Sequence, residues 1–259
     1  MSKKPLILGI ESSCDETAAS LITENEQGIP IVLSNIISSQ VEIHKEFGGV
    51  VPELAARSHM EKIDWIVQKA IDDSGRKIEE IDAVASTAGP GLIVCLSVGL
   101  SFGKAFASAI NKPFIAVNHL EGHALSPKLN SKLNYPYLLL LISGGHSQFL
   151  NVQNLGKYKR LGTTIDDALG EAFDKTAKLL GVEFPGGPQI EIMAKKGDPK
   201  KYDLPKPIFN KGGCNLSFAG LKTAILKVTK NIKTDQEKFD LAASFQKTVE
   251  EILYKKTKI

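Results

Sequence analysis

The sequence predicts an α/β protein in which one supersecondary unit occurs twice. Residues 6–22 form an apolar strand, a small acidic turn and a returning segment of alternating polarity. About 130 residues later, residues 137–152 show the same order of apolar strand, tight Ser-Gly-Gly turn and returning strand. Such a recurrence predicts a duplicated fold. Two hairpins facing one cleft are typical of the actin-like and sugar-kinase ATPase fold, so we expect two actin-like subdomains, residues 1–134 and 135–259.

The segments around the second hairpin supply helices. Pro52 suits the first turn of a helix, and an apolar stripe continues from there to Gly75. Residues 81–110 predict a buried strand, a Gly-Pro-Gly turn and a helix rich in small residues. After the second hairpin, residues 162–181 have apolar positions at helical spacing and end at a glycine, and residues 235–259 are amphipathic. Strands that alternate with such helices favour the α/β class.

Composition sets the broad class of protein. With 259 residues, of which 42% are hydrophobic, the chain can bury a large core. A net charge of +3 does not by itself require nucleic acid, although residues 195–259 hold 15 lysines and 7 acidic residues. That lysine-rich part either contacts phosphates or is a solvated surface. Three cysteines without a C-x-x-C pair, a short apolar N-terminus and no membrane-length apolar run predict a cytoplasmic protein without membrane contact.

The segment VNHLEGHALS places His119 and His123 four residues apart. On a helix this spacing puts both rings on one face, about 5–6 Å apart at Cβ, which suits a shared metal ion. Asn118 is the expected N-cap, and Pro127 marks a stop. Two unrelated surface histidines are the alternative. Glu121 lies about 200° around the helix from His119, which disfavours a metal-dependent endopeptidase.

The glycine-rich turns predict a phosphate site. Without Cβ atoms at Gly144 and Gly145, backbone N–H groups can approach a phosphate closely. Neither a Walker loop nor a G-x-G-x-x-G fingerprint is present. Asp174, inside the helix that follows, suits ribose hydroxyls, and the Pro-Gly-Gly-Pro at 185–188 permits close approach to a flat ring. The alternatives are an ordinary β-turn at Gly144 and Gly145, a solvated surface acid at Asp174 and a rigid turn at residues 185–188.

Eight strings of the sequence together resemble one family. They occur in the order GIESSCDET, GGVVPELAARSH, AGPGL, HLEGH, LISGGHSQ, IDDALGEAFDKTAKLLG, PGGP and LSFAGLKT. This pattern is similar to that of the bacterial tRNA threonylcarbamoyladenosine biosynthesis transferases, formerly described as endopeptidases. The resemblance covers essentially the whole chain.

The resemblance implies a metal-dependent acyltransferase with an actin-like ATPase fold. The expected reaction moves threonylcarbamoyl from threonylcarbamoyl-AMP to the exocyclic amine of the adenosine 3′ of the anticodon, in tRNAs that read ANN codons. By this likeness, His119 and His123 are ligands of one Fe²⁺ or Zn²⁺ ion. By the same likeness, the threonylcarbamoyl-AMP donor is expected on Leu141, Ile142, Ser143, Gly144, Gly145, Asp174 and Gly187, and a nucleotide of the ATP or ADP type is expected in the cleft.

Three acidic residues in the first hairpin complete the expected site. We hypothesise that Glu11, Asp15 and Glu16 position the metal, water or the attacking amine. The resemblance also implies tRNA, a smaller paralogous subunit and a small P-loop ATPase as partners. No nucleophilic serine or cysteine is needed, because the donor is already a mixed anhydride.

The chain departs from the family pattern in one respect. Family members continue for about another quarter of their length, where a Gly-Gly-x-x-x-Asn nucleotide loop and a metal-binding Asp are expected. Neither feature occurs in this sequence. We therefore expect a second subdomain that is incomplete at its C-terminal end. The alternatives to the transferase are a metal-dependent endopeptidase and a catalytically inactive, truncated partner module.

Overall fold

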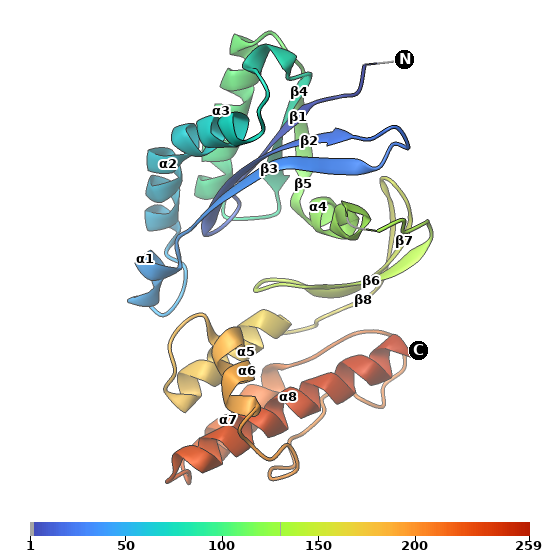
Figure 1. Cartoon of the computed structure of the whole chain (residues 1–259). Helices are drawn as coiled ribbons and strands as arrows, with labels where there is room; N and C mark the ends of the chain where they lie inside the picture. Colours follow the sequence, from blue (N-terminus) through green and yellow to red (C-terminus); the bar gives the residue numbers. More distant parts are fainter. Residues whose placement is uncertain (1–2, 130) are drawn as a thin grey trace. The chain divides into compact units, whose positions relative to one another are not determined.

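The computed structural model describes residues 3–129 and 131–259 of the chain. It divides into two compact units, Met1–Leu133 and Asn134–Ile259, which are drawn together in Figure 1. Each unit has its own sheet and its own hydrophobic core. Each core is built from the residues of one unit alone.

The first unit contains a five-stranded sheet in the order β3-β2-β1-β4-β5. Its strands are β1 (Ile7–Glu11), β2 (Glu16–Glu24), β3 (Pro30–Ser39), β4 (Ala83–Gly89) and β5 (Phe114–Asn118). β1 pairs antiparallel with β2 and β2 with β3, whereas β1 and β5 both pair parallel with β4. The carboxyl ends of β1, β4 and β5 therefore lie at one edge of the sheet, where loops after parallel strands commonly form sites.

Two long helices cover one face of this sheet (Figure 1). α2 (Pro52–Asp73) packs on β2 and β3, and α3 (Ile93–Ala109) packs on β4. Pro52 begins α2 as the spacing predicts, because the ring needs no amide partner in the first turn. The core between helices and sheet includes Leu8, Leu21 and Ile66, each fully buried. Burying one such side chain contributes about 1.5–3 kcal/mol.

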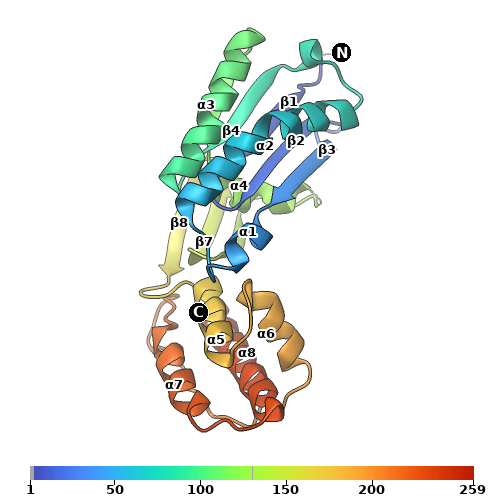
Figure 2. The ribbon, with the colours of Figure 1, turned by 90° about the vertical axis from the view of Figure 1, so that its left-hand side faces the viewer.

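Short elements complete the first unit. α1 (Val41–Lys45) follows β3, η1 (Ile78–Glu80) precedes β4, and α4 (His119–Leu125) with η2 (Ser126–Leu129) follows β5. Figure 2, turned by 90°, shows α1 close to the start of α2. α4 contacts both β4 and β5, so its position is set by the carboxyl edge of the sheet.

The second unit combines a three-stranded antiparallel sheet with four helices. The sheet has the order β6-β7-β8, with β6 (Tyr137–Ile142), β7 (Ser147–Asn154) and β8 (Lys157–Thr163). The helices are α5 (Leu169–Leu180), α6 (Gly186–Ala194), α7 (Ala219–Thr229) and α8 (Asp235–Thr257). α8 begins at a capping box, because Thr234 Oγ1 accepts from the Glu237 N–H and Glu237 accepts from the Thr234 N–H.

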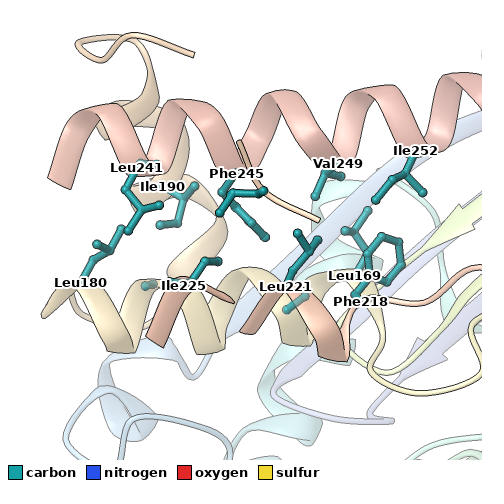
Figure 3. Packing of buried hydrophobic residues seen from close by; sticks show 14 of the residues in the cluster. Leu169, Leu180, Ile190, Phe218, Leu221, Ile225, Leu241, Phe245, Val249 and Ile252 are labelled. Atoms are coloured by element: carbon teal, nitrogen blue, oxygen red, sulfur yellow. The ribbon is translucent and has the colours of Figure 1, made fainter. Parts of the chain in front are cut away.

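The helices of the second unit converge on one core. Figure 3 shows Leu241, Phe245, Val249 and Ile252 of α8 facing Leu221 and Ile225 of α7 and residues of α5 and α6. Phe173 meets Phe245 edge to face, with ring centroids 4.9 Å apart. The predicted helix over 235–259 is thus the element around which this core packs.

Several observed elements were not among the expected ones, among them α1, the edge strand β3 and the edge strand β8. The Pro-Gly-Gly-Pro segment also differs from the turn considered above, because Gly186, Gly187 and Pro188 form the first turn of α6, with Pro185 at the N-cap. Proline and glycine favour turns, yet both are tolerated at a helix start. Among the described residues, none of the helices is both long and apolar enough to cross a membrane.

Candidate functional site

The two histidines of the H-x-x-x-H motif lie on α4, immediately after β5 (Figure 1). The Asn118 side chain accepts from the N–H groups of Leu120 and Glu121, at 3.0 and 3.2 Å, which confirms the predicted N-cap. His119 Nε2 and His123 Nε2 are 3.1 Å apart, and the two rings meet edge to face. The helical spacing therefore brings two imidazole nitrogens to one point.

Glu11, the last residue of β1, lies beside this pair. Its Oε2 atom is 3.5 Å from His119 Nδ1 and accepts from Thr87 Oγ1 at 2.5 Å. Its Oε1 atom accepts from the Ser13 N–H, and Ser13 Oγ lies 3.4 Å from His119 Nδ1. A carboxylate on one imidazole nitrogen fixes the ring and leaves the other nitrogen as the electron-pair donor.

The environment keeps Glu11 ionised. Burial raises the pKa of this carboxyl, but hydrogen bonds from His119, Ser13 and Thr87 lower it more, and the pKa falls to about 2. At neutral pH Glu11 is therefore a carboxylate and a weak base. Its geometry and its pKa both suit a group that orients His119.

The histidine pair fits a metal ion only as a partial ligand set. Two nitrogens bound to one ion at 2.0–2.1 Å in tetrahedral geometry are about 3.3 Å apart, close to the 3.1 Å between His119 Nε2 and His123 Nε2. Neutral imidazoles suit iron and zinc. Within residues 3–129 and 131–259, no group of three His, Cys, Asp or Glu side chains is arranged to hold a metal.

Two buried histidines support the acidic turn between β1 and β2. His59 of α2 bonds the Cys14 carbonyl through Nε2 at 3.0 Å, and its Nδ1 atom receives Thr17 Oγ1 at 2.7 Å. Gln40 links His59 to His44, at 3.3 and 3.2 Å. Burial lowers the pKa of His59 despite the bond to the Cys14 carbonyl and the charges of Glu11 and Asp15. His59 is thus held as a neutral hydrogen-bonding group.

The other two acidic residues of the first hairpin are placed differently from Glu11. Asp15 lies in the turn, where its backbone carbonyl accepts from the Gln40 N–H at 3.0 Å. Glu16 is exposed at the start of β2, opposite Ser39. Burial, followed by the charge of Asp15, raises the pKa of the Cys14 thiol to about 12. Cys14 therefore stays protonated, as expected of a structural thiol.

In the second unit, the Ser-Gly-Gly turn joins Leu141 and Ile142 at the end of β6 to β7. The Ser143 N–H donates to the His146 carbonyl at 2.8 Å, and Ser143 Oγ accepts from the His146 N–H at 3.0 Å. A Cβ atom added to Gly144 or Gly145 would meet no atom within 4 Å. Both glycines thus present backbone toward open space, as a phosphate-binding turn requires.

The N-terminus of α5 packs directly on this turn. A Cβ atom at Gly170 would lie 2.7 Å from the Ser143 carbonyl oxygen and 2.8 Å from Gly144 Cα. The Leu169 N–H donates to Ser147 Oγ at 2.8 Å, which fixes the helix to the start of β7. The helix dipole is therefore directed at the turn, where it favours an anion.

Asp174 contacts the start of α6, at the residue before Gly187. Asp174 Oδ1 accepts from the Gly186 N–H at 2.8 Å, so the carboxylate already stabilises the N-terminus of α6. A Cβ atom at Gly186 would lie 2.7 Å from Asp174 Cα, whereas one at Gly187 would meet nothing within 4 Å. Asp174 thus contacts Gly186, the residue before Gly187, and α5 and α6 position these residues.

Asp166, in the loop between β8 and α5, binds the N-terminus of α7. Asp166 Oδ1 accepts from the N–H groups of Phe218 and Ala219, and Oδ2 accepts from Ser217 Oγ. Burial raises the pKa of Asp166, but these hydrogen bonds lower it more, and the net pKa is below its usual range. The loop between β8 and α5 therefore fixes the N-terminus of α7 relative to the Ser-Gly-Gly turn.

Several residues that shape these sites were not predicted from the sequence, among them Ser13, Thr87, Ser147 and Gly170. Ser13 and Ser147 lie next to the two hairpin turns considered in the sequence, and this proximity was the signal that could have identified them. Thr87 and Gly170 act through contacts between elements, which no local pattern reveals.

Known proteins identify the family of this chain. The model of the TsaD family, tRNA N6-adenosine threonylcarbamoyltransferase, matches residues 31–259. The tRNA N6-adenosine threonylcarbamoyltransferase of Pelagibacter ubique (strain HTCC1062) is 83% identical over 259 residues, which are 100% of this chain and 72% of that protein. The chain belongs to the TsaD family. The protein of the same name from Rickettsia rickettsii (strain Sheila Smith) is 57% identical over 252 residues, 96% of this chain and 72% of that protein.

A solved structure supports the fold of this TsaD-family chain. Component A of (R)-2-hydroxyglutaryl-CoA dehydratase from Acidaminococcus fermentans matches 100% of this chain and 79% of its own, with 13% sequence identity and a TM-score of 0.50. At this identity the likeness concerns the fold alone. It confirms the predicted α/β class and actin-like ATPase fold.

Proposed function

We propose that this chain transfers a threonylcarbamoyl group from threonylcarbamoyl-AMP to the exocyclic amine of the adenosine 3′ of the anticodon, in tRNAs that read ANN codons. Membership of the TsaD family supports the reaction class. The single structural observation that carries the proposal is the convergence of His119 and His123 beside the ionised Glu11. A tRNA substrate makes the cytoplasm the proposed compartment.

The chemistry is an acyl transfer to a weak nucleophile. A bond forms between the amine nitrogen and the carbamoyl carbon, the bond from that carbon to the phosphate oxygen breaks, and the amine releases its proton to solvent water. AMP leaves with its electron pair on the phosphate. No covalent enzyme intermediate is required, since the donor is already activated.

We propose that the residues of the second unit bind the donor. The backbone of Ser143, Gly144 and Gly145 would hold the phosphate, at the N-terminus of α5, which favours negative charge as AMP departs. Leu141 and Ile142 lead into this turn. Asp174 would accept from ribose hydroxyls, and Gly187 would lie against the adenine.

In the first unit, His119 and His123 would hold an Fe²⁺ or Zn²⁺ ion, which when bound supplies a Lewis acid. Glu11 is a positioning residue in this proposal, because it fixes the ring of His119 through Nδ1. Asp15 and Glu16 remain hypothetical contributors from the same turn. As partners we propose a smaller paralogous subunit and a small P-loop ATPase.

The deciding experiment measures transfer of labelled threonylcarbamoyl from its adenylate to unmodified tRNA, with the proposed partner proteins present. The double variant His119→Ala/His123→Ala is expected to lose transfer while keeping its melting temperature. Glu121→Gln is the matched control on the same helix, and it should retain transfer. An endopeptidase that uses Glu121 as its base would instead show no transfer by the unchanged chain and would lose peptide cleavage in Glu121→Gln.

No transfer by the unchanged chain under these conditions would refute the proposed function and favour a non-catalytic partner module. Equal transfer by the unchanged chain and the double variant would remove the histidine pair from the reaction.

A further inference from the structure

The segment between Asp203 and Asp235 contains six lysines and no acidic residue. These lysines lie at positions 206, 211, 222, 227, 230 and 233, so the segment carries a net positive charge, although Lys206 forms an ion pair with Glu251 of α8. α7 (Ala219–Thr229) is its only regular element. Figure 2 shows α7 along one side of the helices of the second unit.

The helical spacing of α7 divides its residues between core and solvent. Leu221 and Ile225 are fully buried in the core of the second unit (Figure 3). Lys222, Lys227 and Lys230 are exposed, and at 100° per residue they lie within an arc of about 140°. They extend over about 12 Å of helix length. We call these three residues the α7 lysine face.

The α7 lysine face differs from other lysines of the second unit. Lys195, Lys238 and Lys247 each contact an acidic residue three or four positions away in the sequence, at 2.8–3.3 Å. Among the described residues, the three lysines of the α7 face have no ion pair. Their charge is therefore not compensated locally and is available to an external anion.

We propose that the α7 lysine face binds the sugar-phosphate backbone of the RNA substrate. This inference rests on the proposed function, which requires a polyanionic RNA to reach the donor. The composition of the α7 surface favours RNA over a protein partner, since Leu226, 43% exposed, is the one exposed large apolar side chain between Ala219 and Thr229. Protein interfaces centre on apolar and aromatic residues, whereas nucleic-acid surfaces are polar and basic.

The packing of α7 determines where RNA bound to the α7 lysine face would lie relative to the proposed donor turn. Asp166 caps α7, and Ser147 fixes the start of α5 beside the Ser-Gly-Gly turn. These contacts lie within one compact unit. RNA held on the α7 lysine face is therefore held in a fixed relation to the proposed donor turn.

The test is binding of fluorescently labelled unmodified tRNA to the full chain, measured by anisotropy between about 50 and 200 mM salt. The variant is Lys222→Gln/Lys227→Gln/Lys230→Gln. The control, Lys195→Gln/Lys238→Gln/Lys247→Gln, removes the same net charge from the same unit. Circular dichroism and thermal melting verify that both variants are folded.

Three phosphate contacts account for a slope of about 2–3 in a plot of log K against log salt concentration. The slope for the α7 variant should therefore be smaller by about 2–3, and the variant should bind tRNA at least about tenfold more weakly. The control should bind nearly as the unchanged chain does. Equal weakening by both variants would show a general charge effect and overturn the inference. Unchanged tRNA binding by the α7 variant, or no tRNA binding by the unchanged chain, would also overturn it.

A loss of partner-protein binding with tRNA binding intact would assign the face to a protein instead. Transfer of threonylcarbamoyl is measured separately in the same preparations. A chain that binds tRNA through α7 without transferring the group would refute the proposed function and leave this inference standing.

Discussion

Replacing Gly170 by alanine tests whether α5 sets the geometry of the Ser-Gly-Gly turn. The added Cβ atom would lie 2.7 Å from the Ser143 carbonyl oxygen and 2.8 Å from Gly144 Cα. Ordinary contact begins near 3.4 Å, so the turn and the helix must separate by about 0.7 Å. Both contacts are to backbone atoms, which cannot rotate away as a side chain can.

The expected change in stability is small, because two effects oppose each other. Crowding of this kind costs about 1–3 kcal/mol, and alanine in place of glycine inside a helix returns about 1 kcal/mol. We expect a net destabilisation of about 0–2 kcal/mol. The effect on the turn is larger, since a displacement of about 1 Å at a site can cost about 100-fold in rate.

The assay compares AMP binding by calorimetry with urea denaturation. Gly170→Ala should bind AMP at least about tenfold more weakly while remaining folded. Gly122→Ala on α4 is the reference, because its Cβ atom would meet nothing within 4 Å; this change should stabilise the chain by up to about 1 kcal/mol. If Gly170→Ala bound AMP as tightly as the unchanged chain, the turn would not be the phosphate site.

Three further predictions concern stability, each measured by urea denaturation. Burial lowers the pKa of His59, so the chain should lose stability as pH falls below about 6.5. His59→Gln should weaken this dependence of stability on pH. An equal loss of stability at acid pH in the variant and the unchanged chain would contradict the prediction. Asp166→Ala removes the cap of α7 and should cost about 1 kcal/mol, whereas no loss would show that the cap is dispensable. Gly162→Ala places a Cβ atom 2.2 Å from the Cys214 carbonyl and should cost about 3 kcal/mol; Gly212→Ala, in open space, should be near neutral, and equal effects would refute the contact.

Local signals in the sequence were sufficient for several elements. The proline at the start of α2, the Asn118 cap of α4 and the periodicity of α8 each act within one or two helical turns. The convergence of His119 and His123 follows from the same local rule, since residues four apart share a helix face. These features needed no knowledge of the rest of the chain.

Other elements depend on partners that a local pattern does not contain. β8 has charged residues at three of its four exposed positions and lacks an alternating apolar pattern, and in the sheet it pairs with β7, so its strand state comes from that ladder. α6 starts inside a Pro-Gly-Gly-Pro segment, because Asp174 accepts from the Gly186 N–H and only glycine fits against Asp174 and Ala177. Tertiary contacts here override the turn preference of the residues.

The residues of the candidate sites also divide into those that the sequence predicts and those that depend on tertiary packing. The sequence by itself determined the histidine pair, the glycine turn and the family resemblance, because each is written in short contiguous strings. Only the tertiary structure decided that Glu11, rather than Asp15 or Glu16, contacts His119, since β1 and β5 run parallel on either side of β4 and end at one edge. Gly170 and Asp166 likewise gained their roles from packing between elements, which depends on three-dimensional proximity and not on sequence spacing.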